Sequence, residues 1–453
     1  MTSHLFPPGF VWGAATSSYQ IEGSPSADGK GVSIWDTFTR TPGAIEDDSS
    51  GDIACDHYRR WESDVDLMAE LGLGAYRFSV AWPRVLPSGD GRVNSAGLDF
   101  YDRLVDRLLD RGIEPWVTLY HWDLPQAIED RGGWPARSVA RAFADYAGIT
   151  ADRLGDRVGR WITINEPWVV AKRGYSYGDK APGHRDAQAA VRATHHLLLG
   201  HGLATQAIRA SAPAARVGIS LNLTPVVPAS TDRADIEAAR RFDGDANRWF
   251  LDPVFGRGYP DDVLRDYSDA GWLDGEVSLE SQADHDLISA SQDFLGVNYY
   301  ERTIIRDPGN GGLPTKVVPA NADVTDMGWE VYPSGLTDLL VGLKNEYRPA
   351  SIVITENGCS SSDSPGDDGQ VHDQRRISFL RDHLLAAHEA VCVGVPLDGF
   401  FAWSLMDNFE WARGYRQRFG LVWVDFETQR RIPKDSAAWY RDVVAANGLV
   451  WNQ

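Results

Sequence analysis

The sequence is poor in cysteine, and its three cysteines, Cys55, Cys359 and Cys392, are widely spaced. An odd, scattered set does not build a disulfide framework, so it indicates a reducing compartment. No metal-ligand spacing links the cysteines, and no second histidine or carboxylate lies at ligand spacing around His121. The sequence therefore predicts no metal site and gives no sign of a cofactor.

Long apolar runs and basic runs are also missing. No apolar stretch reaches the roughly 18 to 20 residues that span a bilayer, and the first residues lack a basic segment followed by an apolar one. We therefore expect a cytoplasmic protein that has no membrane partner. The formal net charge is −20 without any cluster of lysine and arginine. This argues against nucleic acid as a partner, because phosphate binding requires clustered cations.

The composition is that of an ordinary globular protein with many tryptophans. Apolar residues make up 43% and charged residues 24% of the 453 residues. Length alone would suggest two or three domains, but α/β barrels of this size also occur as one domain. The 17 tryptophans suit either a large aromatic core or a carbohydrate site, since sugar rings pack on indole faces. Composition by itself favours the core.

Strand and helix signals alternate along the chain, an order typical of a parallel sheet with crossover helices. Helical spacing predicts helices at 57–71, 97–110, 139–154, 187–210 and 232–250. Buried-strand patterns occur at 10–15, 75–82, 114–121, 161–165, 216–222, 293–299, 351–356 and 397–403. We expect a surface insertion from Ser33 to Cys55, which is rich in Gly, Pro, Asp and Ser. Eight strands interleaved with helices predict an α/β protein, a single (β/α)8 TIM barrel over residues 1–453 with loop insertions at its C-terminal face.

Two of the predicted strands end at a glutamate. The run 161–165 stops at Glu166-Pro167, because proline lacks the N–H that a central strand needs. The run 351–355 is closed by Glu356, followed by Asn-Gly. Either motif alone is more often a solvated turn than a catalytic group. Barrel active sites lie at the C-terminal ends of the strands, however, so the two together predict a pair of carboxylates.

Other polar and aromatic residues follow strands of the same barrel. In chain order these strand ends carry Gln20, Arg77, His121, Asn165, Asn298, Tyr300 and Trp403. A buried Arg77 needs a carboxylate partner and would keep a neighbouring glutamate ionised. His121 alone reads as a core histidine, but its position beside Trp122 at a strand exit favours ligand contact. Two glutamates in such company suit glycoside hydrolysis, where one protonates the departing oxygen and the other meets the anomeric carbon. The residues alone do not assign the two roles.

The chain resembles glycoside hydrolase family 1, the β-glucosidase family, nearly end to end, from the run at 10–23 to Asn408-Phe409-Glu410-Trp411. The resemblance implies that Glu166, in Asn-Glu-Pro, is the acid/base and that Glu356, in Thr-Glu-Asn-Gly, is the nucleophile. It also implies that Arg77 supports the nucleophile. The substrate-binding residues that we expect are Gln20, His121, Trp122, Asn165, Asn298, Tyr300, Trp329, Trp403, Glu410, Trp411 and Phe419.

The implied function is that of a retaining β-glucosidase. It would hydrolyse terminal non-reducing β-D-glucosyl residues, and also β-galactosides and β-fucosides, through a covalent glycosyl-enzyme intermediate. Its substrates would be small β-glucosides such as cellobiose or aryl glucosides, which suggests a part in cellulose and polysaccharide degradation. Homo-oligomerisation and transglycosylation stay open.

Two alternatives are a 6-phospho-β-glucosidase and a non-catalytic sugar-binding relative. Phosphoglucosidase members of the family have serine at the position of Glu410, and a carboxylate there disfavours a sugar phosphate by like-charge repulsion. The presence of both glutamates counts against a non-catalytic relative. One departure is Lys172-Arg173, where many family members have apolar residues at the mouth of the site.

Overall fold

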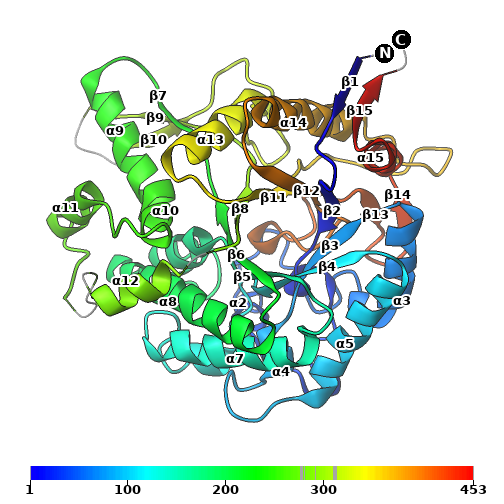
Figure 1. Cartoon of the computed structure of the whole chain (residues 1–453), viewed down its shortest axis with the longest axis horizontal. Coiled ribbons are helices and arrows are strands. Elements are labelled where there is room, and N and C mark those ends of the chain that lie inside the picture. Colours follow the sequence, from blue (N-terminus) through cyan, green and yellow to red (C-terminus); the bar gives the residue numbers. More distant parts are fainter. Residues whose placement is uncertain (1, 276–278, 280, 291, 310–313, 452–453) are drawn as a thin grey trace.

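The structure is a computed structural model that describes residues 2–275, 279, 281–290, 292–309 and 314–451. At its centre is a closed barrel of eight parallel strands (Figure 1). These are β2 (Val11–Ala15), β3 (Ala75–Ser79), β4 (Glu114–Tyr120), β5 (Arg160–Asn165), β6 (Arg216–Asn222), β8 (Phe294–Asn298), β11 (Ile352–Asn357) and β12 (Leu397–Trp403). The barrel closes where β12 pairs with β2. The (β/α)8 barrel predicted from the sequence is therefore confirmed.

The barrel strands are covered on both faces, which explains their nearly continuous apolar sequences. Every residue of β3 and of β11 is buried. Trp116, Phe294 and Phe401 pack together within one buried cluster. Gly13 leaves room for this packing, because a Cβ on Gly13 would lie 2.5 Å from the ring of Phe401. The barrel interior is thus a packed core with no channel through it.

Helices surround the barrel (Figure 1). The longer ones are α3 (His57–Glu70), α5 (Ser95–Asp110), α7 (Ser138–Leu154), α8 (Ala187–Ser211), α13 (Pro333–Glu346), α14 (Gln374–Cys392) and α15 (Asp435–Ala446). The predicted helix at 232–250 is instead three segments: α9 (Arg233–Asp243), a π-helix (Gly244–Arg248) and α10 (Trp249–Val254). The strand predicted at 75–82 ends at Ser79. Trp82, the last residue of that prediction, instead begins α4 (Trp82–Val85), which has Pro83 in its first turn.

Shorter elements complete the fold. They are α1 (Ser18–Ile21), α2 (Ile34–Phe38), α6 (Gln126–Glu129), η2 (Val169–Tyr177), α11 (Asp261–Asp269), α12 (Gln282–Ile288), β1 (Thr2–Leu5), β7 (Val226–Pro228), β9 (Thr303–Arg306), β10 (Thr315–Val317), β13 (Val422–Val424), β14 (Arg431–Pro433) and β15 (Gly448–Trp451). β1 pairs with β15, so the two ends of the described chain lie together (Figure 1).

The segment Ser33–Cys55, predicted as a surface insertion, is partly a core segment. Trp35 in α2 is fully buried and its ring centroid lies 4.5 Å from that of Trp411. The prediction followed the many polar residues of the segment. Its few apolar anchors, Ile34, Trp35 and Ile45, are all buried. The prediction of a surface insertion was therefore wrong for these anchors.

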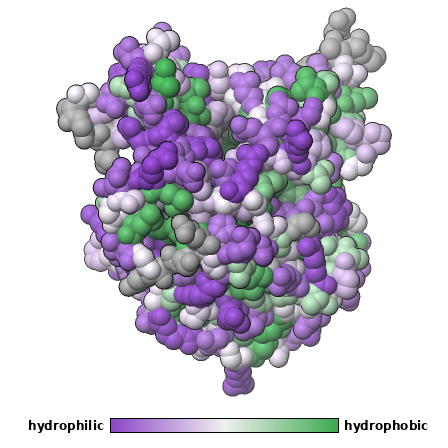
Figure 2. All heavy atoms as spheres, turned by 60° about the vertical axis from the view of Figure 1, so that its left-hand side comes forward, coloured by the Kyte–Doolittle hydropathy of each residue, from purple (hydrophilic) through white to green (hydrophobic). Residues whose placement is uncertain are grey.

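The outer surface is mainly hydrophilic on the face shown in Figure 2, with apolar residues in small separate groups. None of the helices in the described ranges combines the length and apolar character needed to cross a membrane. In the same part of the chain, no three His, Cys, Asp or Glu side chains are placed to hold a metal ion.

Candidate active site

A cavity of about 870 Å³ opens at the carboxyl ends of the barrel strands. Its size is that of a small-molecule site. The predicted site residues that line it are His121, Trp122, Glu166, Asn298, Tyr300, Trp329, Glu356, Trp403, Glu410, Trp411 and Phe419. Gln20, Arg77 and Asn165 do not line the cavity but contact residues that do. The structure therefore gathers residues from most of the chain at one end of the barrel.

Glu356 is surrounded by hydrogen-bond donors. It is buried near the end of β11, and its carboxylate accepts from Arg77 Nη1 and from the Tyr300 hydroxyl, each at 2.6 Å. Burial raises the pKa of Glu356, while the positive charge of Arg77 and the hydrogen bonds from Tyr300 and Asn298 oppose that shift. Arg77 also donates to Thr355 O and Asn165 Oδ1, so its guanidinium is held in place. These contacts stabilise the ionised form of Glu356.

Among the described residues, Glu166 has fewer donors and no cation in hydrogen-bond contact. It directly follows β5 with a left-handed backbone (φ +50°), and the hydrogen bond that its carboxyl accepts comes from Asn298 Nδ2 at 2.8 Å. Burial, and next the negative charge of Glu356, raise the pKa of Glu166 to about 8. Near neutral pH this carboxyl keeps its proton while Glu356 is the readier of the two to ionise. The pair therefore combines a proton donor and a carboxylate in one cavity.

His121 is set up as a neutral hydrogen-bond donor. Burial and the nearby charge of Arg77 lower its pKa well below the ordinary value. Asn165 Nδ2 donates to His121 Nε2 at 3.1 Å, so the ring proton resides on Nδ1. Within the described residues Nδ1 has no hydrogen-bond partner. His121 itself lines the cavity, so its neutral ring lies where a ligand would bind.

Glu410 and the tryptophans form another side of the cavity. Gln20 Nε2 donates to Glu410 Oε2 at 3.4 Å. Burial raises the pKa of Glu410 to about 7, against the nearby charge of Lys180 and the hydrogen bond from Gln20. The indoles of Trp122 and Trp411 lie 4.5 Å apart, and the ring of Trp403 stacks on His121 at 5.8 Å. Flat indoles beside polar groups suit a sugar, which has apolar C–H faces and hydroxyl edges.

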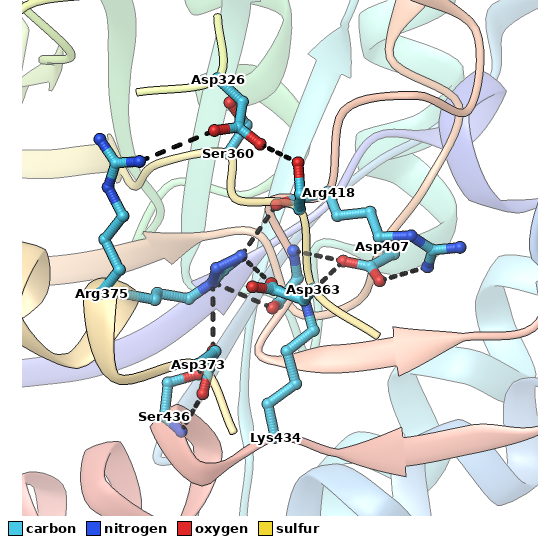
Figure 3. Close-up of polar contacts among 12 residues, drawn as sticks. Asp326, Ser360, Asp363, Asp373, Arg375, Asp407, Arg418, Lys434 and Ser436 are labelled. Carbon is cyan, nitrogen blue, oxygen red and sulfur yellow. Dashed lines mark hydrogen bonds and ion pairs between the residues drawn. The ribbon is translucent and has the colours of Figure 1, made fainter. Parts of the chain in front are cut away.

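A buried ion network, shown in Figure 3, contacts the loop between β12 and β13. The same loop carries Glu410, Trp411 and Phe419. We use the name ion network for Asp363, Asp407, Arg376, Arg418 and Lys434. Lys434 Nζ lies 2.7 Å from Asp363 Oδ2 and 2.9 Å from Asp407 Oδ1, and Arg418 Nη1 lies 2.6 Å from Asp407 Oδ2. Arg376 pairs with Asp363 from α14. The network ties four separate parts of the chain together.

Several residues that line the cavity were not predicted, among them Trp168, Lys180 and Arg185, whereas Arg173 lines it as expected. Trp168 follows Asn-Glu-Pro directly, and that position was the available signal. Lys180 and Arg185 lie in a loop without any motif. Lys172, placed at the mouth by the sequence, is instead buried and donates to Asp245 Oδ1 at 2.6 Å. Neighbouring side chains of the π-helix η2 point in different directions, so that of Lys172 and Arg173 it is Arg173 that lines the cavity.

A (β/α)8 barrel with two carboxyl groups of unlike environment at its open end suits the class of glycoside hydrolases. The sequence profile of "Glycosyl hydrolase family 1" matches residues 2–449. The chain belongs to this family.

Known proteins are similar along almost the entire chain. "Beta-glucosidase A" of Thermotoga maritima is 47% identical over 99% of this chain and 100% of its own length. "Bifunctional beta-D-glucosidase/beta-D-fucosidase" of Bifidobacterium breve is 44% identical over 97% of this chain and 98% of its own. The solved structure of the Thermotoga maritima β-glucosidase in complex with glucoimidazole matches with a TM-score of 0.94, covering 98% of this chain and 100% of that one.

Proposed function

We propose that the protein is a retaining β-glucosidase in which Glu356 is the nucleophile and Glu166 the acid/base. The observation that carries this proposal is the contrast between the two carboxyls. Arg77 and Tyr300 hold Glu356 ready as a carboxylate, while Glu166 keeps its proton up to a pKa of about 8. Glu356 attacks the anomeric carbon while Glu166 protonates the leaving oxygen; Glu166 then deprotonates the water that releases the sugar.

Most of the remaining predicted residues would bind the glycone, while Trp329 would lie on the aglycone side. His121 contacts one sugar hydroxyl, Glu410 accepts from others, and Trp403 packs under the ring. Gln20 and Asn165 hold Glu410 and His121 through the contacts described above. The names of the relatives support glucosides, and fucosides for the bifunctional enzyme. Cellobiose, aryl glucosides and β-galactosides are the further substrates that we propose.

The test of retention is the anomer released first. Proton NMR during hydrolysis of an aryl β-glucoside should show β-glucose before mutarotation, because two displacements invert the anomeric carbon twice. Release of α-glucose would rule out the double displacement. A protein that binds the glucoside without cleaving it would be a non-catalytic relative.

The roles of the glutamates are tested by azide rescue. In Glu356→Ala, azide enters the vacated space and yields the α-glycosyl azide. In Glu166→Ala, an activated aryl glucoside still forms the covalent intermediate, and azide attacks from the opposite face to give the β-glycosyl azide. The same anomer from both variants would overturn the assignment.

A 6-phospho-β-glucosidase is the competing activity within the family. Buried Glu410 beside Gln20 suits neutral hydroxyls and repels a phosphate. Glu410→Ser should therefore reduce glucoside turnover strongly and weaken the bias against 6-phosphoglucosides. A wild-type preference for the phosphorylated aryl substrate would contradict the role of Glu410.

We further infer that residues 1–453 act as one catalytic domain in the cytoplasm, with a part in the breakdown of cellulose-derived sugars. The free cysteines Cys55, Cys359 and Cys392 support a reducing location. Fractionation of the source cells and size-exclusion chromatography would test the location and the oligomeric state.

A further inference from the structure

A loop near the start of the chain, residues 44–50, lies against the turn at 410–415 that carries two of the predicted sugar-binding side chains. Glu46 N–H donates to Ala412 O at 2.9 Å. The carboxylate of Glu46 also forms an ion pair with Arg413. Two segments far apart in the sequence are therefore joined at the edge of the cavity.

The turn at 410–415 has a shape that its own backbone determines. Glu410 N–H donates to Gly414 O at 2.7 Å, and Gly414 N–H donates to Trp411 O at 3.0 Å. Gly414 has φ +60° and ψ −133°, a conformation that glycine adopts readily and other residues avoid. The direction in which Glu410 leaves the turn therefore depends on the backbone at Gly414.

The side chain of Asp47 lies directly against this glycine. Its Oδ2 accepts from Tyr415 N–H at 2.9 Å, while its Oδ1 accepts from Ser49 N–H at 3.1 Å within its own loop. A Cβ on Gly414 would clash with Asp47 Oδ1, so the carboxylate occupies the space that a side chain would need. One carboxylate thus joins the loop at 44–50 to the turn by a hydrogen bond and by close packing.

Asp47 is half-buried and does not itself line the cavity, whereas Glu410 and Trp411 do. It can therefore act on a ligand only through the turn. Glu410 needs such support, because the hydrogen bond that it accepts from Gln20 is long, at 3.4 Å. The backbone of the turn is then the main determinant of where the Glu410 carboxylate lies.

We propose that Asp47 is a positioning residue that holds Glu410 in place for the C6 hydroxyl of the glycone, and that it thereby sets the preference for glucosides over glycosides without this hydroxyl. The inference rests on the proposed β-glucosidase function and adds a residue to its specificity. Loss of the Asp47 carboxylate leaves Tyr415 N–H without its partner, so the turn shifts and Glu410 moves with it. Glu166 and Glu356 keep their own donors.

The test uses two substrates with the same leaving group, 4-nitrophenyl β-D-glucoside and its 6-deoxy analogue. The quantity is the ratio of kcat/KM for the glucoside to kcat/KM for the 6-deoxyglucoside. Asp47→Ala should lower this ratio about tenfold, the effect of losing one hydrogen bond to a charged group. Asp47→Asn keeps one oxygen that can accept from Tyr415 N–H and should retain a larger part of the preference. A merely structural role would lower both values of kcat/KM equally and leave the ratio unchanged.

Two further variants complete the experiment, with rates measured where circular dichroism shows each protein folded. Gly414→Ala introduces a Cβ where Asp47 lies and should lower the ratio as Asp47→Ala does. Asp48→Asn removes an exposed charge from the same loop, outside the cavity lining, and should leave the ratio as in wild type.

The inference and the proposed function fail in different ways. An unchanged ratio in Asp47→Ala would overturn the inference, while hydrolysis of the glucoside upholds the proposed function. A wild-type ratio near one would also overturn the inference, since Glu410 would then make no contact with the C6 hydroxyl. Failure of the wild type to hydrolyse either glycoside would instead overturn the proposed function.

Discussion

Asp407 in the ion network and Glu166 in the cavity are two buried acids with opposite surroundings. In the ion network, Asp407 accepts from Lys434, Arg418 and the backbone N–H of Gly420 at 2.6 to 2.9 Å (Figure 3). In the cavity, Glu166 accepts from Asn298. Buried carboxylates with a full set of donors stay charged and join segments together. A buried carboxyl with few donors retains its proton and can give it to a substrate.

The largest difference should appear in activity when each region loses one charge. Glu356→Gln should reduce kcat for an aryl glucoside by about 10⁴-fold or more, because the attacking group is gone. Asp407→Asn should stay within about tenfold of wild type in kcat, since Asp407 does not line the cavity. Initial rates at a temperature where both variants are folded measure this. A comparable loss in kcat for Asp407→Asn would break the division between the two regions.

For the free energy of unfolding we expect the reverse, with the larger loss in the ion network. Asp407→Asn leaves Lys434 and Arg418 without one of their charged partners, and breaking a buried pair in this way costs about 3 kcal/mol. The free energy of unfolding from urea titration of wild type and variant gives the difference. Arg441→Gln, an exposed change on α15, serves as the control. A loss no greater than that of the control would show that the ion network contributes little stability.

The pH profile should identify Glu166 as the proton donor. Wild-type kcat/KM should be bell-shaped, with an acidic limb from Glu356 and a basic limb from Glu166, whose pKa is about 8. Glu166→Gln, assayed on an aryl glucoside with a good leaving group, should lose the basic limb. Its persistence would show that another group provides the proton.

The smallest expected effect is a pH-dependent gain in stability in Glu166→Gln. The pKa of Glu166 is higher in the folded than in the unfolded state, so the folded state binds more protons between about pH 4 and its folded pKa. Wild-type stability contributed by Glu166 is therefore present at low pH and lost as pH rises. The variant should gain at least about 1 kcal/mol relative to wild type between pH 5 and pH 8, by urea titration. A difference that does not vary with pH would contradict the raised pKa.

The sequence predicted best what depends on local pattern. The barrel strands and the positions of Glu166 and Glu356 at strand ends follow from apolar runs closed by Pro or Asn-Gly. The direction of the Lys172 side chain depends on the π-helix η2, which no local sequence pattern predicted. The ion network joins residues from four separate parts of the chain, so no stretch of sequence contains it. Lys180 was missed for the same reason, because only the fold brings it to Trp122 and Trp411.

Three residues of the cavity, Trp122, Glu166 and Trp411, have left-handed backbones with φ of +80°, +50° and +51°. Such a conformation costs a side chain other than glycine about 1 kcal/mol or more. A population of random variants selected only for heat resistance should therefore drift toward glycine or asparagine at these positions. Selection for sugar cleavage must hold them against that drift. Selection for thermostability alone would therefore replace these three residues of the cavity.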